Sequence, residues 1–295
     1  MVAGEHDSGA LTVDQFRQQI RQALRAVAGD AAGLEADLLL REVLQRSRVQ
    51  LITRGANQLE ATQFAQLTTL LKRRQSGEPL AYILGHREFW SLDLLVTPAT
   101  LIPRPETELL VEIALARVGS EHAQVADLGT GSGAIAIALA SERPGWQLLA
   151  TDQSTAALAV AQQNSQRLQV SNVEFLQGSW FEPLGGRQFD LIISNPPYIA
   201  DDDPCLEVLL GPAADAHPVE PISALTGGSD GLDDCRQLIS AAQNYLKPGG
   251  LLLLEHGHDQ QPRLQQLLEA AGWNQIECFQ DLAGLDRAVL AVAGQ

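Results

Sequence analysis

Apolar residues recur at helical spacing through the N-terminal quarter of the chain, between short polar breaks. A repeat at i, i+3, i+4 and i+7 places apolar side chains on one face of a helix. The pattern predicts helices over residues 12–28, 31–45 and 60–75, packed as a small bundle. Thr12 is the expected N-cap of the first helix, because threonine is a favoured N-cap residue. The core positions expected in the second and third helices are Leu34, Leu38, Leu39, Val43, Phe64, Leu67, Leu70 and Leu71.

After residue 105 the pattern changes to short apolar runs that alternate with helical segments. A short apolar run between turn signals is typical of a buried strand. Alternating strands and helices predict an α/β fold with a mainly parallel sheet. The expected strands are residues 125–128, 146–151, 173–176, 190–194, 251–255, 275–279 and 288–292. The expected helices are residues 106–117, 134–140, 155–168, 232–245 and 262–271.

The segment between these two patterns is a connection. Gly77-Glu78-Pro79 ends the helical repeat, and residues 89–96 alternate as in a strand, which predicts a β-hairpin. Pro103 and Pro105 flank Arg104 and prevent a helix from continuing through it. The predicted organisation is a helical domain over residues 1–76, a linker with a β-hairpin over 77–104, and a Rossmann-like domain over 105–295.

Composition narrows the class of protein. The hydrophobic fraction of 45% supports a well-formed core, and no apolar run approaches the length of a membrane span. The polar, acidic start of the chain argues against a secretory signal, so a cytoplasmic protein is expected. The net charge of −16 opposes nonspecific nucleic-acid binding, which depends on basic side chains. It suits a basic protein partner, and it is equally consistent with plain solubility.

Cysteine and histidine residues predict neither a disulfide framework nor a metal site. Cys205, Cys235 and Cys278 are widely spaced and form no Cys-x-x-Cys motif. His256 and His258 follow a strand-like run, but no carboxylate partner with metal-ligand spacing accompanies them. We therefore expect no metal ion.

The first candidate site is a glycine loop, Gly129-Thr130-Gly131-Ser132-Gly133, between a predicted strand and a helix of small residues. Glycines in this position let the backbone turn tightly and approach a nucleotide closely. Asp152 ends the next strand, where an acidic residue accepts hydrogen bonds from ribose hydroxyls. The loop alone is compatible with NAD, FAD or S-adenosylmethionine. Its Gly-x-Gly-x-Gly spacing differs from the Gly-x-Gly-x-x-Gly of dinucleotide binders.

The second candidate site is the diproline loop, Asn195-Pro196-Pro197-Tyr198, which follows a predicted buried strand. Two prolines stiffen the loop and leave its carbonyl groups free. Such a corner is suited to hold a planar group that bears an NH₂, namely an adenine, a cytosine or a glutamine side chain. The Asn195 side-chain oxygen and the Pro196 carbonyl would each accept one N–H of this group, and Tyr198 would stack on its plane. Together with the glycine loop, this pattern indicates a methyltransferase.

The chain resembles a known family, the protein-(glutamine-N5) methyltransferases that modify peptide chain release factors. The resemblance covers nearly the whole chain, and its most specific part is the stretch Pro103-Arg104-Pro105-Glu106-Thr107-Glu108. The other residues that support it are Tyr82 to Gly85, Glu88 to Trp90, Asp127 to Gly133, Ser194 to Ile199, Glu220-Pro221 and Asp281 to Arg287. The segment Asp215 to Pro218 departs from the arginine often found there, which puts substrate contacts from that loop in doubt.

The resemblance implies a class I methyltransferase fold with a seven-stranded sheet that ends in an antiparallel hairpin. It implies S-adenosylmethionine as the cofactor and the glutamine of the Gly-Gly-Gln loop in class 1 release factors as the substrate. It also assigns the helical domain to gripping that protein, with no stable nucleic-acid or membrane partner. The alternatives are a glutamine methyltransferase of a ribosomal protein, an N6-adenine nucleic-acid methyltransferase, and a noncatalytic S-adenosylmethionine-binding module.

Residue roles follow from the motifs and the resemblance together. The catalytic residues expected are Asn195, Pro196 and Tyr198, and substrate contacts extend to Pro197. The cofactor-binding residues expected are Gly129, Thr130, Gly131, Ser132, Gly133, Asp152, Trp180 and Asn195. Trp180 enters this set by resemblance, as a contact on the adenine side. Arg104 and Glu106 either line the substrate entrance or form a structural ion pair.

Overall fold

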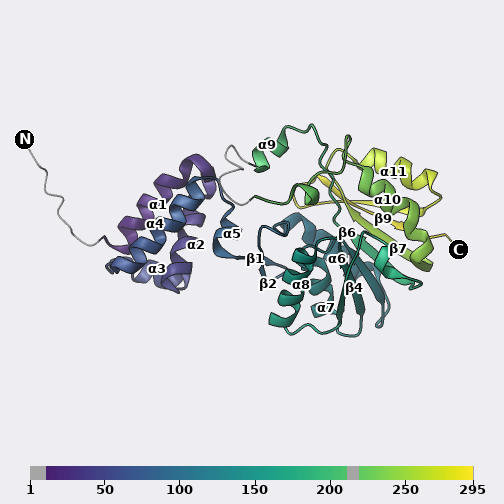
Figure 1. The fold of residues 1–295 in the computed structure, drawn as a ribbon, viewed down its shortest axis with the longest axis horizontal. Helices are drawn as coiled ribbons and strands as arrows, with labels where there is room; N and C mark the ends of the chain where they lie inside the picture. The colour runs from purple at the N-terminus through teal and green to yellow at the C-terminus, as the bar shows by residue number, and fades with distance from the viewer. Residues whose placement is uncertain (1–10, 211–218, 295) are drawn as a thin grey trace, which may run out of the picture. The chain divides into compact units, whose positions relative to one another are not determined.

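The computed structural model describes residues 11–210 and 219–294 (Figure 1). By its internal contacts the chain separates into two compact units. The first, the helical unit, comprises Met1–Leu84 with Leu210–Val219, and the second, the sheet unit, comprises Gly85–Leu209 with Glu220–Gln295. The segment Asp215 to Pro218, where the chain departs from the family's pattern, lies outside the described residues. Over the two described ranges, no helix is long and apolar enough to cross a bilayer.

The helical unit contains the three predicted helices and two short ones. Its elements are α1 (Val13–Ala28), α2 (Ala32–Leu44), α3 (Arg48–Thr53), α4 (Ala61–Gln75) and α5 (Leu80–Leu84). Thr12 caps α1 as predicted, because its hydroxyl accepts from the Gln15 N–H and the Gln15 side chain accepts from the Thr12 N–H. The helices α3 and α5 were not predicted, since six and five residues are too few to establish a periodic pattern.

Helix α2 faces the core with a different stripe from the one predicted. Leu34 is 59% exposed and Leu38 is only partly buried, so the expectation for these two positions was wrong, whereas Val43 packs against the core as expected. Two alanines lie in the buried stripe, which allows α2 to approach its neighbours closely. The buried residues of α2 are Ala32, Ala36, Asp37, Leu39, Leu40 and Leu44.

Helix α4 follows the prediction at three of its four expected core positions. Leu67 is fully buried, and Leu70 and Leu71 pack against the same core. Phe64 is 40% exposed, so its predicted place in the core was wrong. Its ring lies against Phe16 of α1 with 4.9 Å between the ring centroids.

The sheet unit is built on a seven-stranded sheet, as the resemblance implied. The strands are β3 (Gln124–Leu128), β4 (Gln147–Asp152), β5 (Val173–Gln177), β6 (Phe189–Ser194), β7 (Leu246–Glu255), β8 (Asn274–Gln280) and β9 (Asp286–Val292). Their order is β5-β4-β3-β6-β7-β9-β8. The first five strands of this order are parallel, and β9 runs antiparallel to both of its neighbours. The predicted α/β fold and its closing antiparallel hairpin are therefore confirmed.

Helices cover both faces of this sheet (Figure 1). The covering helices are α6 (Glu108–Arg117), α7 (Ala134–Glu142), α8 (Thr155–Arg167), α10 (Asp233–Ala241) and α11 (Gln261–Ala270), whereas the described residues of the short α9 (Cys205–Leu210) contribute to neither core. Val125 and its alternate neighbours pack with α6 and α7, whereas Ala126 and its alternates pack with α10 and α11. Successive strand residues point to opposite faces, and here both faces are apolar because both are covered.

The linker forms the predicted β-hairpin within the sheet unit. It pairs β1 (His86–Phe89) with β2 (Leu92–Leu95), and the turn residues Trp90 and Ser91 both have positive φ. Asn164 of α8 fastens this hairpin, because its side chain donates to Leu95 O (3.0 Å) and accepts from Leu95 N (2.7 Å). The hairpin is thus anchored on the helix that follows β4.

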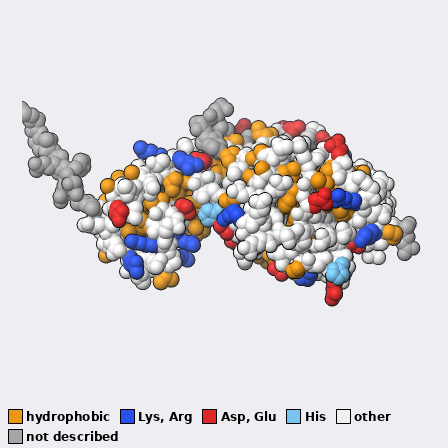
Figure 2. All heavy atoms as spheres, turned by 60° about the horizontal axis from the view of Figure 1, so that its bottom comes forward, with side chains coloured by type: hydrophobic (Ala, Val, Ile, Leu, Met, Phe, Trp, Pro, Cys, Tyr) orange, Lys and Arg blue, Asp and Glu red, His pale blue; other side chains and the backbone are white. Residues whose placement is uncertain are grey.

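The net charge of the chain is unevenly divided between the units. Residues 11–84 hold ten of the chain's 20 Lys and Arg residues and seven of its 36 Asp and Glu residues. Figure 2 shows the basic side chains spread over the visible face of the helical unit. The acidity of the chain is therefore a property of the sheet unit, and any attraction of a basic partner belongs there.

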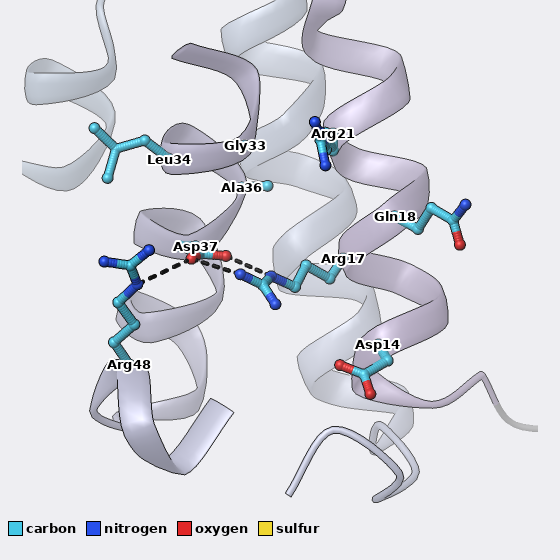
Figure 3. Close-up of a pocket in the computed structure, with 9 residues that line it drawn as sticks. All are labelled: Asp14, Arg17, Gln18, Arg21, Gly33, Leu34, Ala36, Asp37 and Arg48. Atoms are coloured by element: carbon cyan, nitrogen blue, oxygen red, sulfur yellow. Dashed lines mark hydrogen bonds and ion pairs between the residues drawn. The ribbon is translucent and has the colours of Figure 1, made fainter. Parts of the chain in front are cut away.

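A cavity of about 490 Å³ lies in the helical unit, between α1 and α2 (Figure 3). At its centre the Asp37 carboxylate of α2 accepts two hydrogen bonds from the Arg17 guanidinium of α1, at 2.5 and 2.7 Å. Arg48 of α3 approaches the same carboxylate at 3.7 Å. Asp37 is 4% exposed, so these arginines neutralise a buried charge and tie three helices together.

This ion pair generates a stability prediction. Arg17→Met should lower the free energy of unfolding by about 2–3 kcal/mol, because it leaves the buried Asp37 carboxylate without its bidentate partner. Arg21 of the same helix lines the same cavity and has no ion-pair partner within the two described ranges. Arg21→Met should therefore change stability by no more than about 0.5 kcal/mol. Urea unfolding of both variants measures the difference, and equal losses would contradict a structural role for Arg17.

Candidate active site

The carboxyl ends of neighbouring parallel strands meet at one edge of the sheet. The glycine loop follows β3, Asp152 ends β4, the diproline loop follows β6, and Glu255 ends β7. In open α/β sheets, ligands bind in the crevice outside these strand ends. Because β3 lies between β4 and β6, the two loops predicted to act together are neighbours in space.

A cavity of about 540 Å³ opens at this edge. Its volume lies in the range of small-molecule and cofactor sites. Of the residues predicted to form the site, six line it: Gly129, Gly131, Asp152, Trp180, Asn195 and Pro197. The other predicted residues, Thr130, Ser132, Gly133, Pro196 and Tyr198, are not among its lining residues.

The glycines of the loop have different roles in the structure. All three have positive φ, which favours glycine. A Cβ at Gly131 would meet no atom within 4 Å, so this position faces open space in the cavity. A Cβ at Gly133 would lie 2.8 Å from Ile137 Cδ1 and 3.2 Å from Ala161 Cβ. Gly131 thus lets a ligand approach, whereas Gly133 lets α7 and α8 pack closely.

Thr130 turns away from the cavity and anchors the loop. Its hydroxyl donates to Asp127 Oδ2 at 2.6 Å, and the Ala136 N–H donates to the same oxygen at 3.2 Å. Asp127 is 1% exposed, and its burial raises its pKa to about 7, against the lowering effect of these two hydrogen bonds. Asp127 therefore joins the end of β3 to the start of α7.

Asp152 combines a structural contact with a place in the cavity. Its Oδ2 accepts from the Gly131 N–H and its Oδ1 from the Ser154 N–H, each at 2.9 Å. Each carboxylate oxygen has further acceptor capacity, because it has more than one lone pair. Asp152 thus holds the glycine loop in place while its remaining acceptor capacity faces a ligand in the cavity.

Trp180 lies between the cavity and the core. A Cβ at Gly129 would be 3.3 Å from Trp180 Cζ3, which puts the indole ring against the glycine loop. The ring is partly buried against the cluster under α10 and α11. Burial raises the pKa of Asp234, also in the cavity wall, and a hydrogen bond with Trp180 opposes that effect. The indole is therefore oriented by a carboxylate as well as by packing.

The diproline loop is held from behind by a second loop. The Tyr198 carbonyl accepts from Gln260 Nε2 at 2.8 Å, and Ile199 exchanges backbone hydrogen bonds with Leu225 and Gly227. A Cβ at Gly227 would lie 2.5 Å from the Pro197 carbonyl oxygen, so only glycine permits this approach. The loop's carbonyl groups therefore have a defined direction.

Asn195 presents an unpaired acceptor. Its Nδ2 donates to Thr107 Oγ1 at 3.1 Å. Over residues 11–210 and 219–294, no donor bonds to Asn195 Oδ1 or to the Pro196 carbonyl oxygen. Two oxygen acceptors on adjacent residues are thus available to the two N–H groups of one amide. The Tyr198 hydroxyl donates to Glu255 Oε1 at 3.3 Å, so stacking of its ring on a substrate stays a prediction.

Arg104 forms an ion pair with Glu220. Arg104 Nη2 lies 2.5 Å from Glu220 Oε2, and Glu220 Oε1 accepts from the Ile102 N–H at 2.8 Å. Glu220 is 5% exposed, which makes this contact a buried tie between two distant segments of the sheet unit. Arg104 thus forms a structural ion pair, but its partner is Glu220 and not the expected Glu106. Glu106 is exposed and takes no part in it.

The described residues contain no group of three or more His, Cys, Asp or Glu side chains that could hold a metal ion. His256 is fully buried, and its Nδ1 lies 2.8 Å from the Gly257 carbonyl oxygen, whereas His258 is exposed. The two histidines therefore do not converge. Cys205, Cys235 and Cys278 are free thiols.

Four residues at or around the site were not predicted. Asp234 orients Trp180, Asn164 also donates to the Ser132 carbonyl at 2.9 Å, and Thr107 and Glu255 lie behind the diproline loop. Glu255 had a visible signal, a carboxylate at the end of a strand adjacent to β6. Thr107 belonged to a quoted motif without a role, and Asn164 had no signal in the sequence.

The sheet order, the glycine loop and the cavity define a class I methyltransferase. The family model described as "Methyltransferase small domain" matches residues 105–212, and that described as "PrmC N-terminal domain" matches residues 15–85. A solved methyltransferase from Pyrococcus furiosus aligns with a TM-score of 0.53 and 18% identity, covering 69% of this chain and 90% of that one. This likeness shows the fold.

Full-length relatives define the family more narrowly. Release factor glutamine methyltransferase from Coxiella burnetii is 45% identical over 96% of this chain and 100% of its own length. The protein of the same name from Escherichia coli is 43% identical over 94% of this chain and 98% of its own length. The chain belongs to the family of release factor glutamine methyltransferases, as its sequence motifs predicted.

The two glycine positions generate a stability prediction. Gly133→Ala should lower the free energy of unfolding by about 2–3 kcal/mol, because the methyl overlaps Ile137 and the residue has positive φ. Gly131→Ala has the backbone strain without the overlap, and should cost about 1 kcal/mol. Thermal unfolding of both variants measures the two losses. A Gly133→Ala variant as stable as Gly131→Ala would refute the packing role.

Proposed function

We propose that this enzyme transfers a methyl group from S-adenosylmethionine to the side-chain amide nitrogen of the glutamine in the Gly-Gly-Gln loop of class 1 peptide chain release factors. The observation that supports this reaction best is the pair of unpaired acceptors, Asn195 Oδ1 and the Pro196 carbonyl, beside a cofactor-sized cavity. The names of the full-length relatives supply the substrate class.

The residues of the cavity fit S-adenosylmethionine. Gly131 leaves room for close backbone approach, Asp152 offers acceptor capacity for ribose hydroxyls, and Trp180 offers an aromatic face or edge for an adenine. When bound, this cofactor supplies a methyl group on a positively charged sulfur, which is a strong electrophile. The other loop residues, Thr130, Ser132 and Gly133, do not line the cavity and instead hold the glycine loop in place.

The diproline loop positions the nucleophile. A glutamine amide nitrogen is a weak nucleophile, because its lone pair is delocalised into the carbonyl group. Asn195 and Pro196 each accept one N–H, which fixes the rotation of the NH₂ group and favours positive charge developing on the nitrogen. Holding the nitrogen in line with the methyl carbon replaces an improbable encounter with an oriented one. A protonated N-alkylated amide is acidic enough to lose its proton to water, so no strong general base is needed.

The helical unit is the proposed gripping element for the release factor. It is a compact unit with its own core, and its described residues include more basic than acidic side chains. In this proposal the sheet unit carries out methyl transfer to the glutamine. The helical unit binds the parts of the release factor that lie outside the Gly-Gly-Gln loop.

The central test is loss of the amide acceptor. Asn195→Ala should reduce turnover by ~10²-fold or more, because orientation of the reacting amide is lost. Asn274→Ala, at an exposed position on the edge strand β8, is the matched control and should leave turnover unchanged. The measurement is the mass of a class 1 release factor after incubation with S-adenosylmethionine, which should rise by one methyl group on the Gly-Gly-Gln glutamine. Methylation of a ribosomal protein or an oligonucleotide instead would overturn the proposed substrate.

Cofactor binding gives a second test. Asp152→Ala should weaken S-adenosylmethionine binding by about tenfold, because hydrogen bonds to the ribose and to the Gly131 N–H are lost. Asp190→Ala removes a carboxylate at the amino end of β6, where it bonds Lys247 and the Gln124 N–H, and should leave binding unchanged. Isothermal titration calorimetry of the two variants compares them. Equal dissociation constants would remove Asp152 from the cofactor site.

A further inference from the structure

Thr107 occupies the N-cap position of α6 without capping it. The residue ends the short 3₁₀ turn Pro105–Thr107, and α6 begins at the next residue. Threonine at this position normally accepts a hydrogen bond from the first turn of the helix, which stabilises the helix by about 1 kcal/mol. In this structure the Thr107 backbone is already helical, with φ −66° and ψ −19°, and its side chain makes no such bond. Thr107 is 4% exposed, so its hydroxyl needs a partner inside the protein.

The Thr107 hydroxyl instead accepts the Asn195 amide. Asn195 Nδ2 donates to Thr107 Oγ1 at 3.1 Å, and this is the contact that gives the Asn195 side chain its direction. A hydroxyl that accepts one hydrogen bond still has its own proton to donate. Glu255 is the candidate acceptor for this proton, because a hydrogen bond from Thr107 acts to lower the pKa of the Glu255 carboxyl.

Glu255 is a buried carboxyl at the end of β7. It is 1% exposed, and its Oε1 accepts the Tyr198 hydroxyl at 3.3 Å. No donor among the described residues lies within hydrogen-bonding geometry of its Oε2. The charged and titratable groups that face it are Tyr198 from the diproline loop, Arg287 from β9 and Glu106 from the 3₁₀ turn, and the buried His256 follows it. A buried carboxyl with so few partners costs stability, so stability does not account for Glu255 at this position.

We propose that Thr107 and Glu255 are positioning residues that orient the Asn195 amide, with its NH₂ toward Thr107 and its oxygen toward the substrate glutamine. This inference rests on the proposed function. The oxygen and nitrogen ends of an asparagine amide have nearly the same size, so packing alone does not choose between them. The hydrogen bonds of Thr107 and Glu255 determine which orientation of the Asn195 amide is favoured. An ionised Glu255 accepts only, so Thr107 donates to it, and the lone pairs of Thr107 face Asn195.

The opposite orientation of Asn195 would be inactive. With Glu255 protonated, the carboxyl becomes a donor, and Thr107 is free to turn its proton toward Asn195. The Asn195 oxygen can then accept from Thr107, which places the asparagine NH₂ against the NH₂ of the substrate. Two donors facing each other form no hydrogen bond, and the clamp is lost. Ionised Glu255 thus favours the active orientation.

The hydrogen-bond chain from Glu255 through Thr107 to Asn195 predicts that turnover depends on pH. Burial raises the pKa of Glu255 to about 7, while hydrogen bonds from Thr107 and Tyr198 and the charge of Arg287 oppose the rise, and the charge of Glu106 adds to it. The carboxyl loses its proton as the pH rises through this value, so turnover should rise with it and fall at lower pH. The reacting glutamine amide does not titrate in this range. Burial lowers the pKa of His256, which separates its titration from that of Glu255.

The decisive experiment compares two substitutions of Thr107. Thr107→Val removes the hydroxyl at nearly constant volume and should lower kcat by about tenfold, with S-adenosylmethionine binding unchanged. Thr107→Ser keeps the hydroxyl and should retain turnover within about twofold. Each variant is measured for release-factor methylation, for cofactor dissociation constant and for thermal unfolding. A Thr107→Val variant with wild-type kcat, or a Thr107→Ser variant as impaired as Thr107→Val, would overturn the inference.

A double-mutant cycle separates positioning from general support of the fold. Because Thr107 acts through Asn195, adding Thr107→Val to Asn195→Ala should change kcat by less than about twofold. Additive losses would mean that Thr107 acts by another route, and would refute the proposal. The cycle is informative only if wild-type protein methylates the release factor. An inactive wild type would count against the proposed function, whereas an active wild type with an additive cycle counts against this inference alone.

The pH profile tests Glu255. Wild-type kcat should fall as the pH drops below about 7, and Glu255→Gln, which cannot ionise, should have a clearly smaller fall between about pH 6 and 8. Any fall that remains belongs to Asp127, whose pKa burial also raises to about 7. Thr107→Val should lose the same part of the fall as Glu255→Gln, because it disconnects Glu255 from Asn195. If kcat of either variant falls at low pH as much as wild-type kcat does, the proposed hydrogen-bond chain is contradicted. If Glu255→Gln does not fold, the Thr107→Val profile still decides the matter, since that substitution leaves Glu255 in place.

Discussion

The convergence of parallel strand ends is the constraint on which the site depends. Because β4, β3, β6 and β7 are adjacent and parallel, the loops that follow them open at one edge of the sheet. Segments separated by more than sixty residues, the glycine loop and the diproline loop, share one cavity for this reason. The helices on both faces bury the sheet, so the loops of the cavity wall extend from strands that are packed on both sides.

Buried polar side chains convert this edge into a defined site. Asp127 ties the glycine loop to α7, Asn164 ties the hairpin and the loop to α8, and Glu255 lies behind the diproline loop. Each is at most 1% exposed. Such groups are costly unless they are hydrogen-bonded, and they make the geometry specific when they are. In this enzyme they orient backbone and side-chain groups that face the ligand, while they themselves stay out of the cavity.

The motifs were readable in the sequence because each depends on local chemistry. A strand followed by glycines and a helix of small residues, and a strand followed by Asn195 and two prolines, specify their own turns. The alternation of strands and helices predicted the α/β fold in the same local way, whereas the seven strands and the closing hairpin were implied by the family resemblance that these motifs support. The misplaced core positions, Leu34 and Phe64, were errors of helix rotation, since a broad apolar stripe does not say which of its edges meets the neighbouring helix. Helices α3 and α5 were too short to leave a pattern.

Whether the sequence alone or only the tertiary structure determines a feature depends on how far apart in the chain the interacting residues lie. Strand and helix order, the glycine turns and the stiff diproline corner arise from residues close together in the chain, and the sequence suffices for them. The roles within the glycine loop do not: Gly131 faces a cavity and Gly133 faces α8 only because α8 folds back against α7. The same is true of Thr107, which lies 88 positions before Asn195 and meets it across the sheet edge. Contacts between distant segments depend on how the strands are ordered, and no local pattern encodes that order.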